Sequence, residues 1–250
     1  MKYYEQLLDA RCFTRDDVVR ITGGVAAANS LLYEYKKRGL IESVRKNLYV
    51  AVSLETKQPA ASRYLIGSRV SPGAYVSHHS AFEVHGVANQ VFNEVFVSSK
   101  EKFSSFEFDG VTYTRVAPRI DSGVVEVMGV RVTEPERTVA DCANDLGKLI
   151  GLEELLRCIG MLPSLNEEKM RLHLTNYSKK CLFQKTGYLL ELFPSLPLSP
   201  DFFKWCREMS GKSVRYLFSD ARGMGGRGVF VREWGLVVPG NMDLLLEGVS

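Results

Sequence analysis

Three of the four histidines of the chain lie close together, at His78, His79 and His85. Imidazole nitrogens are common zinc ligands, so such a group could hold a metal ion. The six-residue spacing from His79 to His85 does not place both side chains on one helical face, and neither a cysteine pair nor a carboxylate motif surrounds them. We therefore expect these histidines to pack or to face solvent, and we expect no metal site.

Two further groups could carry catalysis. Cys142 beside Asp141, with the distant His173, could form a thiol nucleophile, and the segment 167–169 contains the Glu-x-Lys triplet of metal-dependent nucleases. No local nucleophile motif surrounds the cysteine. The triplet lies where the pattern predicts a helix start rather than a strand. We therefore expect no catalytic residue and no enzyme activity.

The segment 223–228 has the spacing Gly-x-Gly-x-x-Gly. A dinucleotide fingerprint follows a strand and opens a helix. Here the sequence Val-Phe-Val follows at 229–231, which is typical of a strand. We interpret the segment as a turn and expect no cofactor.

Residues 25–38 combine an apolar helical stripe with a second face of small and polar side chains. The stripe is formed by Ala28, Leu31, Leu32 and Tyr35. Small residues let a helix backbone approach the major groove of DNA, polar side chains reach base edges, and basic ones hold phosphates. The residues that we expect to contact DNA are Arg15, Ala26, Ala27, Asn29, Ser30, Tyr33, Lys36, Lys37, Arg45, Lys46 and Asn47.

The neighbouring elements could position this helix as part of a winged helix-turn-helix domain over residues 1–56. A short helix is expected at 3–11, and Thr14 before two acidic residues predicts the start of a second helix. Gly23-Gly24 separates that helix from the one at 25–38. Strands expected at 40–44 and 48–52 would form a hairpin whose tip, 45–47, is the wing. The alternative is a helical bundle with a solvated hairpin.

Composition excludes several classes of protein. The chain has 250 residues with 45% hydrophobic and 24% charged residues, which is typical of globular proteins. No apolar run approaches the roughly 18 residues of a membrane-spanning helix, and the polar first residues do not resemble a signal peptide. The five cysteines are odd in number and widely spaced, so we expect free thiols and a cytoplasmic location.

A polar segment with Pro59, residues 53–61, is the best candidate for a linker. Beyond it, helical and strand patterns are mixed, so we predict an α+β domain over 57–250. Helices are expected at 60–70, 79–85, 135–145, 151–159, 167–177 and 181–192. Strands are expected at 75–77, 94–97, 106–108, 111–116, 124–128, 130–132, 229–231 and 234–238.

The net charge of +3 is unevenly distributed. Residues 171–232 contain eleven Lys and Arg but four Asp and Glu, whereas residues 57–170 carry a net −3. This excess predicts a second basic surface that could attract DNA or an acidic partner, although solvated charges on several faces would give the same count. Its members would be Lys179, Lys180, Lys185, Lys204, Arg207, Arg215, Arg222 and Arg227.

Five segments in order extend this pattern over most of the chain. They are the winged-helix region 13–50, the segment 75–86 with Ser-His-His-Ser-Ala-Phe and His-Gly, the segment 132–141 with Pro-Glu-Arg and a later Asp, the helix at 188–191, and the strand at 234–237. Together they resemble the AbiEi family of antitoxins from type IV toxin–antitoxin systems.

The resemblance implies a winged-helix repressor that binds inverted repeats in double-stranded operator DNA upstream of its own operon. It also implies antagonism of a co-encoded nucleotidyltransferase-like toxin, by contact with the toxin or with its substrate. Two alternatives stay open from the residues themselves. One is a nuclease targeted by the winged helix, which would need carboxylates converging on one pocket. The other is a metabolite-responsive repressor with a deep apolar pocket in its second domain.

Overall fold

The computed structural model describes residues 2–217 and 228–248, and its fold is α+β, as predicted. The chain divides into two compact units. The first comprises Met1–Val76, Asn93–Ala117 and Met128–Arg131, and the second comprises Ser77–Phe92, Pro118–Val127 and Val132–Ser250. The predicted winged-helix domain therefore belongs to a larger unit, and whether residues 1–56 fold alone stays a prediction.

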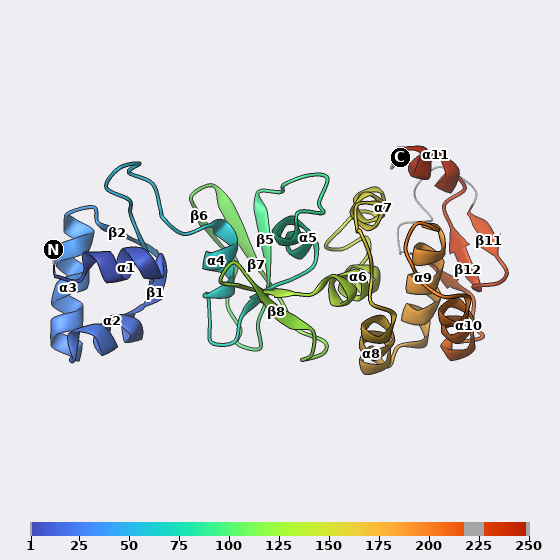
Figure 1. The fold of residues 1–250 in the computed structure, drawn as a ribbon, viewed down its shortest axis with the longest axis horizontal. Coiled ribbons are helices and arrows are strands. Elements are labelled where there is room, and N and C mark those ends of the chain that lie inside the picture. Colours follow the sequence, from blue (N-terminus) through green and yellow to red (C-terminus); the bar gives the residue numbers. More distant parts are fainter. Residues whose placement is uncertain (1, 218–227, 249–250) are drawn as a thin grey trace. The chain divides into compact units, whose positions relative to one another are not determined.

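The N-terminal part of the first unit has the element order of a winged helix (Figure 1). Its three strands form an antiparallel sheet in the order β1-β3-β2. Strand β1, which the sequence pattern did not predict, pairs with β3 and closes this sheet. The elements are α1 (Tyr4–Ala10), β1 (Cys12–Thr14), α2 (Arg15–Thr22), α3 (Val25–Lys37), β2 (Ile41–Arg45) and β3 (Leu48–Ala51).

Local chemistry explains where these helices begin and end. Thr14 and Asp17 form a reciprocal capping box at the start of α2, which satisfies backbone donors that the helix leaves open. Gly23 ends α2 in the left-handed conformation that glycine adopts without steric cost. Buried side chains from all three helices, including Leu7, Val18 and Leu32, form one hydrophobic core. The predicted turn between α2 and α3 is confirmed.

The predicted linker is folded back on the winged helix. The amide of Ala60 donates to the carbonyl of Ala51 over 2.8 Å, and Val52 forms an isolated β-bridge with Pro59. The turn between them is closed by the amide of Ser53, which donates to the carbonyl of Gln58. This segment therefore turns back along the end of β3 rather than forming an extended connection.

The rest of the first unit is one short helix and most of a six-stranded sheet in the order β6-β7-β5-β4-β9-β8, which ends with β9 (Val130–Thr133) and β8 (Val124–Val127). Strand β5 lies between β4 and β7, antiparallel to the first and parallel to the second, and β6 pairs with the outer edge of β7. The predicted helix at 60–70 is shorter in the structure. The elements are α4 (Arg63–Ser68), β4 (Tyr75–Val76), β5 (Glu94–Ser98), β6 (Phe106–Phe108) and β7 (Val111–Val116).

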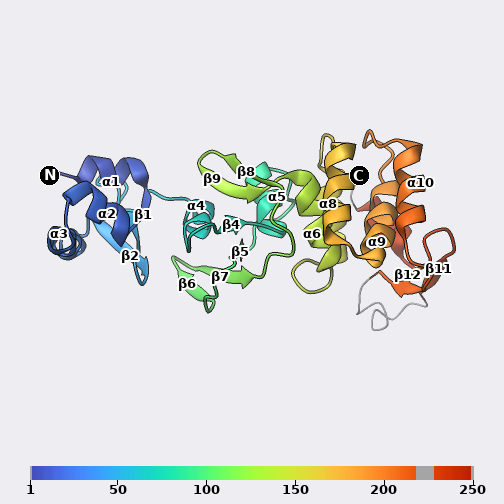
Figure 2. The same ribbon diagram turned by 90° about the horizontal axis from the view of Figure 1, so that it is seen from below.

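The second unit is mainly helical, and the chain enters it for the last time within β9. Helix α9 packs against α6, α8 and α10 (Figure 2), and buried residues of these helices form a large core with Trp234 and Leu236. The elements are α5 (His79–His85), β8 (Val124–Val127), β9 (Val130–Thr133), α6 (Pro135–Asn144), α7 (Leu152–Gly160), α8 (Glu167–Tyr177), α9 (Lys180–Glu191), α10 (Pro200–Met209), β10 (Arg215–Tyr216), β11 (Val229–Val231), β12 (Leu236–Val238) and α11 (Met242–Glu247).

Three elements of this unit were not predicted: α10, β10 and α11. Helix α10 begins at Pro200, in the first-turn position that a proline tolerates, after the N-cap Ser199. The three prolines between 194 and 200 had instead predicted an extended break at this point of the chain. Strand β10 has only two residues and is defined by its pairing with β12, which no local pattern reveals. No helix of the described residues is long and apolar enough to cross a membrane.

Candidate nucleic-acid interface

Helix α3 has a solvent-exposed face made of the residues that the sequence predicted for it. Ala28, Leu32 and Tyr35 are buried, as the apolar stripe requires. The opposite side leaves Ala26, Ala27, Asn29, Ser30, Tyr33, Lys36 and Lys37 exposed. Tyr33 is the largest of these side chains, with 67% of its surface accessible. A helix with small residues first, polar ones next and lysines last fits the approach to a major groove.

Helix α2 supplies one more predicted residue to this face. The Nε of Arg15, which is half-buried, donates to the Oδ1 of Asn29 over 2.9 Å. The bond joins the first turn of α2 to the second turn of α3. It fixes the amide of Asn29 at a position where an adenine edge or a phosphate could compete for it.

Of the two acids in the first turn of α2, Asp16 is exposed and Asp17 is engaged by neighbouring groups. The carboxylate of Asp17 accepts from the backbone amide and hydroxyl of Thr14, and it also pairs with Arg20. Burial alone would raise the pKa of Asp17, but these hydrogen bonds and the Arg20 charge hold it below its usual value. Its negative charge is therefore partly neutralised within α2, which reduces repulsion of phosphate.

The wing residues have different environments. Lys46 and Asn47 are exposed at the hairpin tip, where Asn47 adopts a φ of 65° that asparagine tolerates. Arg45 is half-buried, and its guanidinium lies 5.1 Å from the ring centroids of both Phe103 and Phe106. Arg45 is thus engaged in cation–π contacts within the first unit, whereas Lys46 is available to a phosphate.

The predicted second basic surface is only partly assembled. Lys179, Lys180 and Arg215 line one surface hollow of about 360 Å³ at the start of α9. Lys179 donates to the Oδ1 of Asn144 over 2.7 Å. Within the described residues, neither Lys180 nor Arg215 forms an ion pair with an acid. These three cations could attract an anion together.

The other members of that prediction lie in different environments. Burial lowers the pKa of Lys185, and Lys204 is exposed on α10. Arg207 pairs with Glu191 at 2.9 Å and lies over the ring of Trp234. Arg222, Arg227 and most of the glycine-rich segment 223–228 lie outside the described residues.

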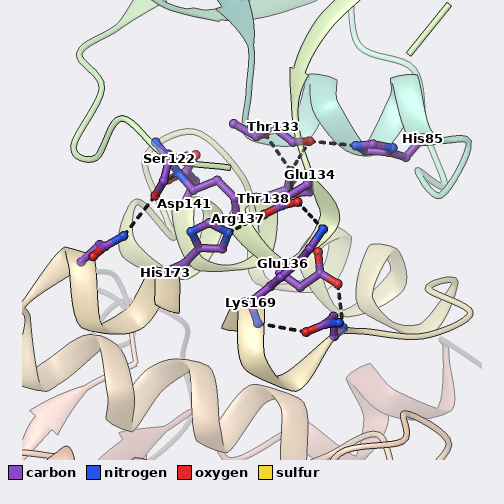
Figure 3. A network of polar contacts seen from close by, with 12 residues as sticks. His85, Ser122, Thr133, Glu134, Glu136, Arg137, Thr138, Asp141, Lys169 and His173 are labelled. Carbon is purple, nitrogen blue, oxygen red and sulfur yellow. Dashed lines mark hydrogen bonds and ion pairs between the residues drawn. The ribbon is translucent and has the colours of Figure 1, made fainter. Parts of the chain in front are cut away.

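The second unit also contains a buried polar network around the start of α6 (Figure 3). The Nε2 of His173 lies 2.7 Å from the Oε1 of Glu134, and the Nζ of Lys169 donates to its Oε2 over 2.6 Å. Burial would raise the pKa of Glu134, but the hydrogen bonds from Lys169 and His173 hold it below its usual value. Both oxygens of this carboxylate are occupied.

Arg137 is the second centre of this network and is almost fully buried, with 1% of its surface accessible. Its Nε donates to the Oδ1 of Asp141 over 2.7 Å, and its Nη1 donates to the carbonyl of Ser122. The hydroxyl of Tyr177 donates to the same carboxylate. These contacts join α6, α8 and the loop before β8, so Arg137 and Asp141 of the sequence motif hold three segments together.

The structure also places the two groups that were considered for catalysis, the Cys142 thiol and the Glu-x-Lys triplet at 167–169. Cys142 is completely buried, and burial raises the pKa of its thiol, which is unfavourable for a nucleophile. Glu167 lies in the first turn of α8, where it pairs with Arg171 and accepts from the amide of Ser199. Its helical position is as predicted.

The histidines at 78, 79 and 85 contact polar groups, some of which lie far away in the sequence and were not predicted. His85 bonds the carbonyl of Thr133 over 2.8 Å, and the ring of His78 bonds the hydroxyl of Ser77. His79 lies between two carboxylates, one from its own helix and one from α7. The first stands four residues after His79 and could have been noticed from the spacing. The second is 75 residues away, and no sequence pattern connects it.

No protein-family model and no curated protein matches the sequence. Among solved structures, the chain is similar to the crystal structure of the RV2827C protein from Mycobacterium tuberculosis. The TM-score is 0.61 at 14% sequence identity, and the alignment covers 98% of this chain and 92% of that chain. At this identity the similarity shows a shared fold alone.

Proposed function

We propose that this protein binds double-stranded operator DNA through its winged helix and represses transcription of its own operon. The observation that carries the proposal is the exposed face of α3, where small, polar and basic side chains follow one another along the helix. The exposed Lys46 in the wing adds a phosphate contact beside it. A dimer would place two such helices on an inverted repeat.

We further propose that the protein acts in the cytoplasm as a non-enzymatic antitoxin against a co-encoded nucleotidyltransferase-like toxin. This part depends on the resemblance to AbiEi antitoxins, which extends from the winged helix to the last strand. The cations around the hollow at the start of α9 offer a place for an acidic toxin surface or for the toxin's nucleic-acid substrate.

The DNA-binding proposal is tested by fluorescence anisotropy with two duplexes of equal length. One carries an inverted repeat from upstream of the gene, and the other is a random sequence of the same composition. Asn29→Ala and Ser30→Ala should each weaken operator binding by about 1–3 kcal/mol and leave random binding nearly unchanged. Lys37→Ala should weaken both complexes equally, and Lys2→Ala, before α1, serves as the control. Equal losses on both duplexes for Asn29→Ala and Ser30→Ala would remove these residues from base recognition.

The antitoxin proposal is tested by co-expression with the product of the adjacent reading frame. The wild-type protein should restore growth, and the double variant Lys179→Glu, Lys180→Glu should restore it less while keeping its unfolding midpoint. Lys102→Glu, an exposed lysine of the other unit, is the matched control. Full protection by the double variant, with unchanged DNA binding at low ionic strength, would mean that these lysines are only solvated.

A nuclease is the competing class. The carboxylates of Glu134 and Asp141 are each bonded to cationic or hydroxyl groups, whereas a metal-dependent nuclease needs carboxylates open to a metal ion and substrate. This observation favours the regulator. Magnesium-dependent cleavage of DNA or RNA that disappears in Glu134→Gln would favour the nuclease instead.

A further inference from the structure

A cluster of metal-ligating side chains is buried between α5 and α7, within the second unit. His79 and Cys158 are fully buried, and Glu154 is 8% exposed. The Nε2 of His79 lies 2.9 Å from the Oε1 of Glu154, and the Sγ of Cys158 lies 3.5 Å from the same oxygen. One donor atom from each residue lies within 4.8 Å of the others.

Two of these three separations can be compared directly with those of a zinc site. Zinc bonds to nitrogen, oxygen and sulfur at about 2.0, 2.1 and 2.3 Å, so ligand atoms of a tetrahedral ion lie about 3.4–3.6 Å apart. The nitrogen–oxygen separation is slightly shorter and the sulfur–oxygen separation matches. Glu154 and Cys158 stand four residues apart on α7, which places both on one face of that helix. Small rotations of the side chains would admit an ion.

The surroundings of His79 have the arrangement that zinc-binding histidines use. Its Nδ1 lies 2.8 Å from the Oε1 of Glu83, whose side chain is 1% exposed, while its Nε2 faces Glu154. The backbone amide of Phe92 donates to that Glu83 oxygen over 3.1 Å. A carboxylate on the far nitrogen fixes the tautomer of a metal-bound imidazole and increases its basicity. The Phe92 ring stacks on the imidazole at 3.9 Å and limits its rotation.

We propose that His79, Glu154 and Cys158 bind a zinc ion, with Glu83 as the carboxylate that orients His79. The three ligands leave the fourth tetrahedral position to a water molecule. A mixed nitrogen, oxygen and thiolate set favours zinc over magnesium or calcium, which prefer oxygen ligands. The backbone amide of the exposed Gln90 donates to the Oε1 of Glu154 over 3.3 Å, so the chain after α5 borders the cluster. The site is independent of the proposed DNA binding.

The test uses the full chain, produced without a polyhistidine tag and stripped with a chelator. Cobalt(II) serves as the spectroscopic probe, and zinc is titrated in competition with a chelating dye. We expect one equivalent of either metal, a near-ultraviolet thiolate-to-cobalt band, and a higher unfolding midpoint with zinc. Cys158→Ser should abolish the band. Glu83→Gln should retain the band and weaken zinc binding by about 10–100-fold, as for other supporting carboxylates.

Cys142→Ser is the matched control, because Cys142 is equally buried in the same unit and lies outside the cluster. It should keep both the band and the affinity. The proposal is overturned if the folded, metal-free protein binds no stoichiometric zinc, or if the band survives in Cys158→Ser. It is also overturned if Cys142→Ser loses metal to the same extent. If Cys158→Ser does not fold, unchanged zinc affinity in Glu83→Gln would overturn it.

Discussion

Lys46 and Arg45 are neighbours in the wing, and the structure predicts that their substitution has opposite consequences. Both were expected to hold phosphates. Lys46 is exposed and, within the described part of the chain, has no acidic partner. The Arg45 guanidinium lies 5.1 Å from the ring centroids of both Phe103 and Phe106. Lys46→Ala should therefore weaken DNA binding without affecting stability, whereas Arg45→Ala should lower stability and leave the salt dependence of binding intact.

The magnitudes follow from counterion release. Each phosphate contact contributes about 0.9 to the slope of log affinity against log salt concentration. Between 50 and 200 mM salt, loss of one contact therefore changes the ratio of the two affinities by roughly 3.5-fold. Arg45→Ala loses cation–π contacts worth about 0.5–2 kcal/mol, depending on how far the guanidinium is desolvated.

The assay is a salt series of anisotropy titrations on random DNA, combined with urea unfolding of each variant. Lys46→Ala should flatten the slope by about one unit for each wing that touches DNA, with an unchanged urea midpoint. Arg45→Ala should lower the urea midpoint and keep the wild-type slope. The reasoning fails if Arg45→Ala flattens the slope at wild-type stability, or if Lys46→Ala leaves the slope unchanged.

Three further predictions concern stability. A fragment of residues 1–61 should unfold at higher urea concentration than one of residues 1–56, because the longer fragment keeps the backbone contacts between the 53–61 segment and β3. Equal unfolding midpoints would mean that these contacts do not stabilise the fragment. Arg137→Ala should lower the free energy of unfolding by about 3–5 kcal/mol, because it leaves the buried carboxylate of Asp141 without its cation. The double change Arg137→Met, Asp141→Leu should cost much less. Similar losses for the single and the double variant in urea unfolding would contradict this. Burial would raise the pKa of Asp145, but hydrogen bonds from His78 and Asn144 lower it to about 2. This value lies below the pKa of about 3.9 in the unfolded chain. The ionised Asp145 therefore stabilises the folded state above pH 4, and this stabilisation is lost as pH falls towards 2. The stability difference between wild type and Asp145→Ala should therefore shrink over that range, and a constant difference would exclude this linkage.

The winged helix could be predicted from the sequence because its determinants are local. Thr14 and Asp17 stand at the spacing of a capping box, and Gly23 marks the end of a helix. The apolar stripe of residues 25–38 has the helical period, so its exposed face follows directly. Each of these features involves residues within one or two turns of each other, and local sequence is sufficient to specify them.

The tertiary structure decided which charged and ligating side chains meet. Sequence counting gave residues 171–232 a large positive charge, but only the fold places Arg215 beside Lys180 and pairs Arg207 with Glu191. Glu154 reaches His79 across 75 positions because α5 and α7 belong to one unit. Side-chain contacts between distant segments depend on how whole helices pack. Helix packing is determined by the burial of many apolar residues at once, and not by the polar residues that the packing brings together.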